Sequence, residues 1–283
     1  MKKFFKIKSF AKINISLNVI KKLKSKFHKI ESLITFVKLY DIIYIRKIES
    51  KNHKIFFKGK FSKGIKFNNS IRQLLTIINK KKYIKNKKFE IKIIKNIPQK
   101  SGMGGGSMNA ASLLKFLIKK KMIKLNKYEL IDLCDSIGSD VILGTDFRNT
   151  IVSSKNKISR FKNKLNLHVL IVKPNFGCST KLIYSKVRKF SKPQYNKPSF
   201  KLFDLDNIVK SKNDLESIAF KEHPKLKALK LSLMKFPNVI FTRMTGSGST
   251  ILAYFKTKSA CDIAYKDLKK RYKNYWCIVS KTI

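Results

Sequence analysis

A run of glycines at residues 102–106 constrains this chain more than any other feature. It holds four of the chain's 11 glycines, and an apolar segment with helical spacing follows it directly. A loop so poor in side chains lets backbone N–H groups close around a ligand. A helix that begins at the end of such a loop adds the positive end of its dipole, and the two together bind phosphate. The sequence therefore points to a protein that uses a nucleotide.

The glycine loop matches neither of the two commonest phosphate-binding motifs. Residues 98–111 read P-Q-K-S-G-M-G-G-G-S-M-N-A-A, without the G-x-x-x-x-G-K-[ST] pattern. The G-x-G-x-x-G pattern fails because Ser107 stands where its third glycine belongs. A plain turn between a strand and a helix is the simpler interpretation. Such a turn needs only one or two glycines, and Ser107 offers a hydroxyl where a phosphate or a metal would lie.

Length and composition favour a folded protein of one large domain or two ordinary ones. The chain has 283 residues, of which 43% are hydrophobic. No apolar run approaches the roughly 18 residues of a membrane helix, and lysines interrupt the N-terminal segment, so we expect no membrane partner. The four cysteines are scattered without metal-ligand spacing, which favours free thiols in a reducing, cytoplasmic location.

The net charge of +49 has two interpretations. The lysines are spread along the whole chain, and isoleucine, asparagine and phenylalanine are abundant as well. All four residue types have A/T-rich codons, so coding bias explains the charge. The alternative is a selected basic surface, as in a protein that binds RNA or DNA through its phosphates. A small anionic substrate would profit from the field in either case.

The periodicity of the sequence predicts two α+β lobes that meet near residues 150–165. Alternation over residues 12–19 predicts a strand with one apolar face, whose polar face carries Lys12 and Asn14. Asn126 and Glu129 form a capping pair for a helix over residues 127–137. The other expected strands are at residues 31–39, 42–46, 89–94, 167–172, 239–244, 250–255 and 276–279, and helices are expected from residues 110, 224 and 260. We divide the chain into domains 1–158 and 159–283.

Other residues stand out only weakly when each is taken alone. Asp140, one of 16 acidic residues, follows an expected helix end at Gly138 and has the simple interpretation of a solvated turn. A second glycine segment at residues 244–250 lies between two expected strands, where a hairpin turn is unremarkable. It would also serve as a second backbone wall for an anion. His28, beside Phe27, is by default a surface histidine, although the two could grip a flat ligand together.

Together these segments resemble the kinase family named for galactokinase, homoserine kinase, mevalonate kinase and phosphomevalonate kinase. Residues 98–111 resemble its P-x-x-x-G-L-G-x-G-S-S-x-A-A loop. Within the family the chain is most similar to the members that phosphorylate a cytidine-diphosphate-linked methylerythritol. Their signature P-A-K-x-N-L is matched by F-A-K-I-N-I at residues 10–15, and their M-T-G-S-G motif by residues 244–248.

Four further segments extend the resemblance over nearly the whole chain, in the family's order. The family's G-Y-H corresponds to Lys26, Phe27 and His28, and its G-A-D-V-P corresponds to G-S-D-V-I at residues 138–142. Residues 213–216 read N-D-L-E and resemble its N-D-[FL]-E segment. Residues 174–180 resemble a segment that ends in a threonine on the substrate side.

The resemblance implies a two-lobed α+β fold with the active site in the cleft between the lobes. Its N-terminal lobe would be like the second domain of ribosomal protein S5, and its C-terminal lobe ferredoxin-like. It implies transfer of a phosphoryl group from ATP, with Mg²⁺, to the 2-hydroxyl of 4-diphosphocytidyl-2-C-methyl-D-erythritol. That reaction belongs to the non-mevalonate route to isoprenoids. Asp140 would be the general base and Lys12 its partner, and no protein side chains are dedicated to the metal.

The remaining roles follow residue by residue from the same resemblance. Phe27 and His28 would hold the cytosine, and Asn14 would touch the erythritol part. The expected ATP-binding residues are Pro98, Gln99, Lys100, Ser101, Gly102, Met103, Gly104, Gly105, Gly106, Ser107 and Met108. The expected substrate-binding residues are Asn14, Phe27, His28, Phe176, Thr180, Gly246, Ser247 and Gly248.

Three departures from the family's pattern stand out. Lys100 and Ser101 occupy usually small positions, Met108 replaces a serine, and Phe27 replaces a tyrosine. The alternatives are another alcohol kinase of the family, an inactive relative that keeps the fold, and a basic nucleic-acid-binding protein. We expect a small-molecule substrate and no specific nucleic acid, and the sequence leaves the oligomeric state open.

Overall fold

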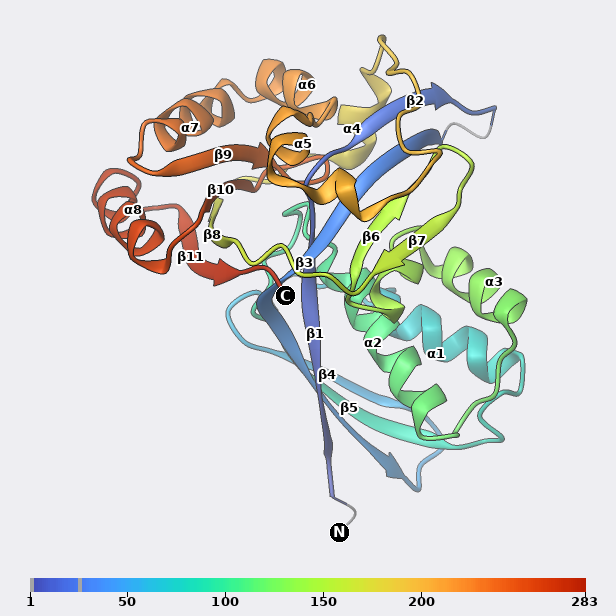
Figure 1. Cartoon of the computed structure of the whole chain (residues 1–283). Helices are drawn as coiled ribbons and strands as arrows, with labels where there is room; N and C mark the ends of the chain where they lie inside the picture. The colour runs from blue at the N-terminus through green and yellow to red at the C-terminus, as the bar shows by residue number, and fades with distance from the viewer. Residues whose placement is uncertain (1–2, 25–26) are drawn as a thin grey trace. The chain divides into compact units, whose positions relative to one another are not determined.

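The computed structural model describes residues 3–24 and 27–283, which form two compact units (Figure 1). Unit 1 consists of the chain up to Lys12 together with residues 39–99 and 104–147. Unit 2 consists of residues 13–38, 100–103 and 148–283. The units interleave along the chain, whereas we expected contiguous domains 1–158 and 159–283, and that division stays a prediction.

Unit 1 combines part of a mixed sheet with three helices. Its elements are the start of β1 (Phe5–Asn14), the end of β3 (His28–Ile48), β4 (Lys54–Lys58), α1 (Ser70–Lys80), β5 (Lys88–Ile94), α2 (Gly105–Lys119), α3 (Lys127–Ile137) and a 3₁₀ turn at Ile142–Thr145. Strand β5 pairs with β3 in antiparallel register and with β4 in parallel register. Helices α1 and α2 bury their apolar faces on β3 and β5, as Figure 1 shows, and this contact forms the core of the unit.

Unit 2 contains a four-stranded sheet that is covered by helices. Its elements are β2 (Asn18–Lys22), the start of β3, β6 (Asn149–Val152), β7 (Ile158–Phe161), β8 (His168–Lys173), α4 (Thr180–Ser185), a 3₁₀ turn at Phe200–Phe203, α5 (Leu205–Lys210), α6 (Leu215–Glu222), α7 (Pro224–Met234), β9 (Val239–Met244), β10 (Ile251–Phe255), α8 (Lys258–Arg271) and β11 (Trp276–Lys281). Within this unit β3 pairs with β2 and β6, and β6 pairs with β7.

The four-stranded sheet of unit 2 has the ferredoxin-like arrangement that the resemblance implies. Its spatial order is β11-β8-β10-β9, and every neighbouring pair is antiparallel. Along the chain the order is strand, helices, two strands, helix, strand, which is the β-α-β-β-α-β pattern. Helices α6, α7 and α8 pack on the sheet through a shared cluster of buried leucines, alanines and cysteines. The expectation of two α+β parts is therefore confirmed.

Several elements lie where the sequence placed them. Helix α3 covers Lys127–Ile137, and both hydrogen bonds of its capping box between Asn126 and Glu129 are present. Strand β9 and the start of α7 at Pro224 also coincide with the expectation. The strong signals were local: a cap, a proline in a first turn and an apolar run.

The opening strand differs from its expected form. β1 begins at Phe5 and ends at Asn14, and β2 begins only at Asn18. The polar residues of the alternating segment are buried along with the apolar ones, because they have partners inside the protein. Ser16, for example, accepts hydrogen bonds from the Leu33 amide and the Tyr195 hydroxyl. The alternation of apolar and polar residues is therefore not an alternation of buried and exposed ones, and the single strand expected over residues 12–19 is interrupted between Asn14 and Asn18.

The expected strands at residues 31–39 and 42–46 are parts of the single strand β3. Asp41 interrupts the apolar pattern, but it is buried and fully hydrogen-bonded, so the strand continues through it. Strands β4, β6 and β7 and helices α1, α4, α5 and α6 were not anticipated from the periodicity. Among the described residues, every helix is too short or too polar to cross a membrane.

Candidate active site

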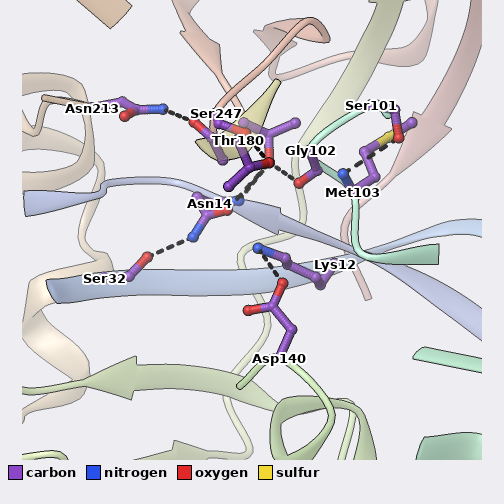
Figure 2. Close-up of polar contacts among 12 residues, drawn as sticks. Lys12, Asn14, Ser32, Ser101, Gly102, Met103, Asp140, Thr180, Asn213 and Ser247 are labelled. Atoms are coloured by element: carbon purple, nitrogen blue, oxygen red, sulfur yellow. Dashed lines mark hydrogen bonds and ion pairs between the residues drawn. The ribbon is translucent and has the colours of Figure 1, made fainter. Parts of the chain in front are cut away.

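Unit 1 brings Lys12 and Asp140 together as an ion pair (Figure 2). Lys12 lies near the end of β1, and its ammonium Nζ is 3.2 Å from Oδ2 of Asp140. The Lys12 side chain is 6% exposed and that of Asp140 is 36% exposed. The lysine is thus held inside the protein, whereas the carboxylate keeps an open side. A carboxylate with an open side can accept a hydrogen bond from a ligand.

Asp140 owes its position to the end of α3. The helix ends at Gly138, whose N–H donates to the carbonyl of Cys134 at 3.0 Å. Two residues later the carbonyl of Asp140 accepts from the Leu143 amide at 3.2 Å and so opens the following 3₁₀ turn. The backbone of Asp140 is therefore fixed on both sides, and its side chain points toward Lys12.

Gly104 lies directly against the Lys12–Asp140 pair. A Cβ at this position would stand 3.0 Å from Cγ of Lys12 and 3.7 Å from Oδ2 of Asp140. Gly104 also has a φ of +67°, which favours glycine, and it is the N-cap residue that precedes α2. The open N–H groups at the start of a 15-residue helix therefore lie beside the ion pair. The structure thus brings this lysine, this aspartate and the start of the helix together, and the roles that the resemblance implies for them stay predictions.

A second, buried lysine–aspartate pair holds the two ends of the loop segment in unit 1. The Asp41 carboxylate accepts from the Lys95 ammonium, from the backbone N–H groups of Asn96 and Ile97 at 2.7 and 2.9 Å, and from the Asn109 amide at 3.0 Å. Asn96 and Ile97 precede the glycine loop, and Asn109 lies on α2 after it. Sequence reasoning missed Asp41 and Lys95, because nothing marks one aspartate inside a strand or one lysine among so many.

Other loop residues in unit 1 are held by neighbouring backbone. Gln99 is exposed, and its amide donates to the carbonyls of Phe61 and Lys63 at 2.9 and 2.8 Å. Pro98 is buried. Gly105 lies against Ile97, since a Cβ there would meet its side chain at 3.1 Å. The chain before the helix therefore has a defined path.

The first turn of α2 separates open residues from buried ones. Gly106 is exposed and lies beside the Ser70 hydroxyl, which a Cβ at Gly106 would meet at 3.4 Å, whereas Ser107 is half-buried. Met108 is fully buried against Gly144, and its N–H donates to the Gly104 carbonyl at 2.9 Å. Its side chain fills the core where we expected it to face ATP, so a contact between Met108 and ATP stays a prediction.

In unit 2, residues 100–103 pack against the second glycine segment. Gly102 has a φ of +74°, and a Cβ there would strike the carbonyl of Thr245. A Cβ at Gly246 would stand 3.0 Å from the Gly102 carbonyl. The Thr245 hydroxyl donates to that same carbonyl at 3.2 Å. Two glycine turns that are far apart in sequence thus touch backbone to backbone, which explains why glycine occurs in both. Residues 101 and 103, on either side of Gly102, are buried.

Asn14 joins this assembly from the end of β1 (Figure 2). Its backbone N–H donates to the Thr245 hydroxyl at 3.0 Å, and its side-chain amide donates to the Ser32 hydroxyl at 2.8 Å. The residue is only 2% exposed. The structure thus gives Asn14 partners within the protein, and its contact with a substrate stays a prediction.

The N-D-L-E segment at residues 213–216 holds the second glycine turn in place. The Asn213 amide donates to the carbonyls of Met244 and Gly246, both at 2.8 Å. The Glu216 carboxylate accepts from the Met244 N–H at 2.7 Å, and Asp214 accepts from the Val19 N–H at 2.7 Å. Sequence reasoning noted this segment without giving it a role, which is to fix strand ends around the glycine turn.

His28 lies in an aromatic cluster of unit 2. Its ring centroid is 5.2 Å from that of Tyr184 and 6.5 Å from that of Phe190. Burial and the charge of Lys22 lower the pKa of His28, so its imidazole is neutral near pH 7. Phe27 is 74% exposed, and Lys26 of the same motif lies outside the described residues. Sequence reasoning missed Tyr184 and Phe190, which follow no motif.

The expected substrate residues of the later segments also gather in unit 2. The hydroxyls of Thr180 and Ser247 share a hydrogen bond of 2.8 Å. Gly248 lies beside Met244 and Cys178, whose sulfur atoms a Cβ would meet at 2.9 and 3.1 Å. Phe176 stacks on His223 with centroids 5.2 Å apart. Thr180, Ser247 and Gly248 therefore come together, while Phe176 faces a ring of the protein itself.

Side chains that could hold a metal ion unaided are not clustered in the described part of the chain. No group of three or more histidine, cysteine, aspartate or glutamate side chains is placed to do so. The side-chain oxygen groups around the start of α2 include the Asp140 carboxylate and the hydroxyls of Ser70 and Ser107. This donor set suits an ion that is held chiefly by the phosphates of a nucleotide.

Comparisons with known proteins agree with this geometry. The family described as "GHMP kinases N terminal domain" matches residues 69–146, and "GHMP kinases C terminal" matches residues 199–274. The 4-diphosphocytidyl-2-C-methyl-D-erythritol kinase of Pelagibacter ubique is 55% identical over 279 residues, 99% of either chain. The enzyme of that name from Petrotoga mobilis is 33% identical, over 87% of this chain and 96% of its own.

Solved structures share the fold at low sequence identity. A crystal structure of 4-(cytidine 5'-diphospho)-2C-methyl-D-erythritol kinase has a TM-score of 0.79 at 20% identity, over 98% of this chain and 99% of that one. The homoserine kinase from Cytophaga hutchinsonii has a TM-score of 0.71 at 16% identity, over 100% and 95%. Full-length identity and fold together show that this chain is an enzyme of the GHMP kinase family, in the group of the 4-diphosphocytidyl-2-C-methyl-D-erythritol kinases.

Proposed function

We propose that this enzyme transfers the γ-phosphoryl group of ATP to the 2-hydroxyl of 4-diphosphocytidyl-2-C-methyl-D-erythritol. The observation that carries the proposal is the Lys12–Asp140 pair, 3.2 Å apart and beside Gly104 at the start of α2. A carboxylate that is partly exposed, a buried cation and a helix N-terminus are the groups that phosphoryl transfer to an alcohol requires. The names of the full-length relatives supply the acceptor.

Asp140 acts as the general base in this proposal. Its open carboxylate side accepts the proton of the acceptor hydroxyl as the oxygen attacks phosphorus. Lys12 orients the carboxylate and stabilises the negative charge that builds on the transferred group. Phosphoryl transfer involves little covalent chemistry by the protein, so positioning and positive charge dominate the rate. The glycine loop, residues 98–108, supplies donors for the phosphates of ATP.

Aromatic and polar side chains of unit 2 support recognition of the cytidylyl part. His28 and Phe27 hold the cytosine in this proposal, and Tyr184 and Phe190 extend the aromatic surface beside His28. The neutral imidazole of His28 can donate one hydrogen bond and accept another, which suits a pyrimidine edge. Asn14, Phe176, Thr180 and residues 246–248 are the further proposed substrate residues.

Mg²⁺ would enter with ATP and neutralise charge on its phosphates. The Asp140 carboxylate and the Ser107 hydroxyl are oxygen ligands that the protein offers at the start of α2. A small anionic substrate is the proposed partner, and the charge of +49 raises its local concentration without a specific nucleic-acid site. The four cysteines are buried and form no disulfide, which supports a cytoplasmic location in this proposal. Cell fractionation would test the location.

The acceptor is tested by the activity of the purified chain toward a panel of alcohols. We expect ADP to form with 4-diphosphocytidyl-2-C-methyl-D-erythritol and Mg²⁺-ATP, and only background rates with homoserine or mevalonate. Phosphorus NMR should show a new phosphate ester on the methylerythritol part. Faster turnover of homoserine or mevalonate would replace the proposed acceptor, and no turnover of any alcohol would favour an inactive relative.

A further inference from the structure

The wall of a small cavity in unit 2 contains a charged residue, Lys100, that is absent from the family's pattern. The cavity has a volume of about 330 Å³ and is lined by Lys100, Gly102, Gly177, Cys178, Ser179, Thr180 and Gly248. Lys100 stands where the resembled loop has a small residue. We propose that Lys100 is a specificity-determining residue whose ammonium group binds phosphate oxygens in this cavity. The proposal rests on the proposed function for the identity of its phosphate sources.

The stem of Lys100 is placed by the glycine opposite it. A Cβ at Gly177 would stand 2.8 Å from Cβ of Lys100 and 3.5 Å from its Cδ. The aliphatic part of the lysine therefore lies along the Gly177 backbone, in space that any other residue at 177 would fill. Lys100 itself has a φ of +49°, which a lysine rarely adopts. Residues with a strained backbone conformation of this kind are common at ligand-binding sites.

The wall opposite Lys100 has a fixed shape. The Lys173 ammonium donates to the carbonyls of Pro174 and Phe176 at 2.9 and 3.0 Å. The buried Ser249 hydroxyl donates to the Phe176 carbonyl at 2.7 Å. These bonds fold the turn that leads into Gly177 and Cys178. Because these three hydrogen bonds already order the wall of the cavity, little conformational entropy is lost when a ligand binds.

The charges around the cavity favour an anion. No carboxylate lines it, and Lys100 makes no ion pair within the described residues. Burial raises the pKa of the Cys178 thiol to about 11, so the cavity contains no thiolate near pH 7. The remaining polar groups are the hydroxyls of Ser179 and Thr180, which can donate. An ammonium group and hydroxyl donors without a competing anion are a phosphate-binding set.

Two phosphate sources fit the proposed reaction, namely the diphosphate of the cytidylyl substrate and the phosphates of ATP. Calorimetric titration of the full chain with CDP, with ATP and with inorganic pyrophosphate separates them. Lys100→Met keeps the unbranched stem and the Cβ, and it removes only the charge. We expect it to weaken binding of at least one of the three ligands by about tenfold, because one charge-assisted hydrogen bond is lost. Lys100→Arg should restore most of the affinity.

Lys121→Met is the matched control, since Lys121 is an exposed lysine with a φ of +53° that lies after α2 in unit 1. It should change each affinity by less than about twofold, as expected for one distant screened charge. A loss for CDP alone assigns Lys100 to the cytidylyl substrate, and a loss for ATP alone assigns it to the nucleotide. Changes below twofold with all three ligands, or equal losses in the control, would overturn the proposal.

Gly177→Ala gives an independent test through the stem of Lys100. The new methyl group must displace the lysine, so we expect the ligand that responds to Lys100→Met to weaken in Gly177→Ala as well. In a Lys100→Gly background the same change should matter less, because the 2.8 Å contact with Cβ of Lys100 is gone and only the 3.1 Å contact with the backbone carbonyl of residue 100 remains. Equal losses in both backgrounds would contradict the proposal.

The test separates this proposal from the proposed function. If the chain fails to phosphorylate the methylerythritol substrate but its pyrophosphate affinity depends on Lys100, the cavity stands and the proposed reaction falls. If the chain phosphorylates the methylerythritol substrate but its affinities for CDP, ATP and pyrophosphate do not change when Lys100 is replaced, the proposed reaction stands and the proposed role of Lys100 is wrong.

Discussion

Among its described residues, unit 1 contains three lysine–aspartate pairs; one, Lys81–Asp132, is exposed, and the other two differ in what surrounds their carboxylates. In the Lys12–Asp140 pair the carboxylate is 36% exposed and lies against Gly104. In the Lys95–Asp41 pair the two side chains are 5% and 0% exposed. Asp41 also accepts from two backbone N–H groups and from the Asn109 amide. The same two residue types thus form an open pair and a closed one.

The difference separates chemistry from scaffolding. A carboxylate whose lone pairs are all used inside the protein cannot take a proton from a ligand, but it can fix the backbone that donates to it. Asp41 fixes the entrance of the glycine loop and its connection to α2. Asp140 keeps an open side, and it is the pair's only member that a ligand can reach readily. Burial and the number of donors, rather than residue type, distinguish the two roles.

The largest stability effect should follow from opening the closed pair. Asp41→Ala leaves the Lys95 ammonium buried without its partner, and we expect it to lower the free energy of unfolding by about 3–5 kcal/mol. Asp140→Ala should lower it by a smaller amount, because this carboxylate is 36% exposed and water can replace part of its contact with Lys12. Urea unfolding followed by circular dichroism measures both. If the alanine variant does not fold, the milder Asp41→Asn replaces it. Equal losses in the free energy of unfolding at positions 41 and 140 would contradict the distinction between the closed pair and the open one.

Acid should weaken unit 1 through the partly buried His53. Burial, and then the charge of Lys88, lower the pKa of His53 from 6.5 to about 4. The folded state therefore binds the proton less readily than the unfolded state. The stability that His53 contributes is complete above pH 6.5 and is lost as the pH falls toward 4. A protonated ring can no longer accept from the Phe89 N–H, which donates to Nδ1 at 3.1 Å.

His53→Asn separates this loss from titration of the carboxylates. It keeps an acceptor for the Phe89 N–H but has no charge to gain. Its melting temperature should fall less between pH 6.5 and pH 4 than that of the unchanged protein. Parallel falls in the two proteins would assign the acid sensitivity to groups other than His53.

The smallest effect concerns the helix that positions Asp140. Asn126 caps α3 at the end far from Asp140, and Asn126→Ala should lower the free energy of unfolding by about 1 kcal/mol. Turnover should stay unchanged, because Gly138 and the following 3₁₀ turn fix Asp140 locally. A fall in kcat in proportion to the lost stability would show that the open pair depends on the whole helix.

The open pair could be anticipated from the sequence and the closed pair could not. Lys12 and Asp140 lie in motifs that resemble a known family, and Gly104 between them signals a close approach of backbone. Asp41 sits in an apolar strand, where it only interrupted the period of two. Its four donors come from residues 54 to 68 positions away. Local pattern has no access to partners at that separation.

The same distinction applies to the fold. The capping box of α3 and the proline at the start of α7 are local signals, and both helices begin where the sequence placed them. The break between β1 and β2 depends on partners such as Tyr195, Lys212 and Asp214, which lie far along the chain. Asn213, Glu216 and Tyr184 likewise act through contacts that only the folded chain brings together.

The central claim is that the open carboxylate performs the chemistry. The direct test is the turnover of Asp140→Asn with Mg²⁺-ATP and 4-diphosphocytidyl-2-C-methyl-D-erythritol, beside the exposed control Asp135→Asn on α3. We expect Asp140→Asn to bind both substrates while its kcat falls by at least about 100-fold, and Asp135→Asn to keep the unchanged rate. A kcat of Asp140→Asn within a few-fold of the unchanged protein would contradict the account.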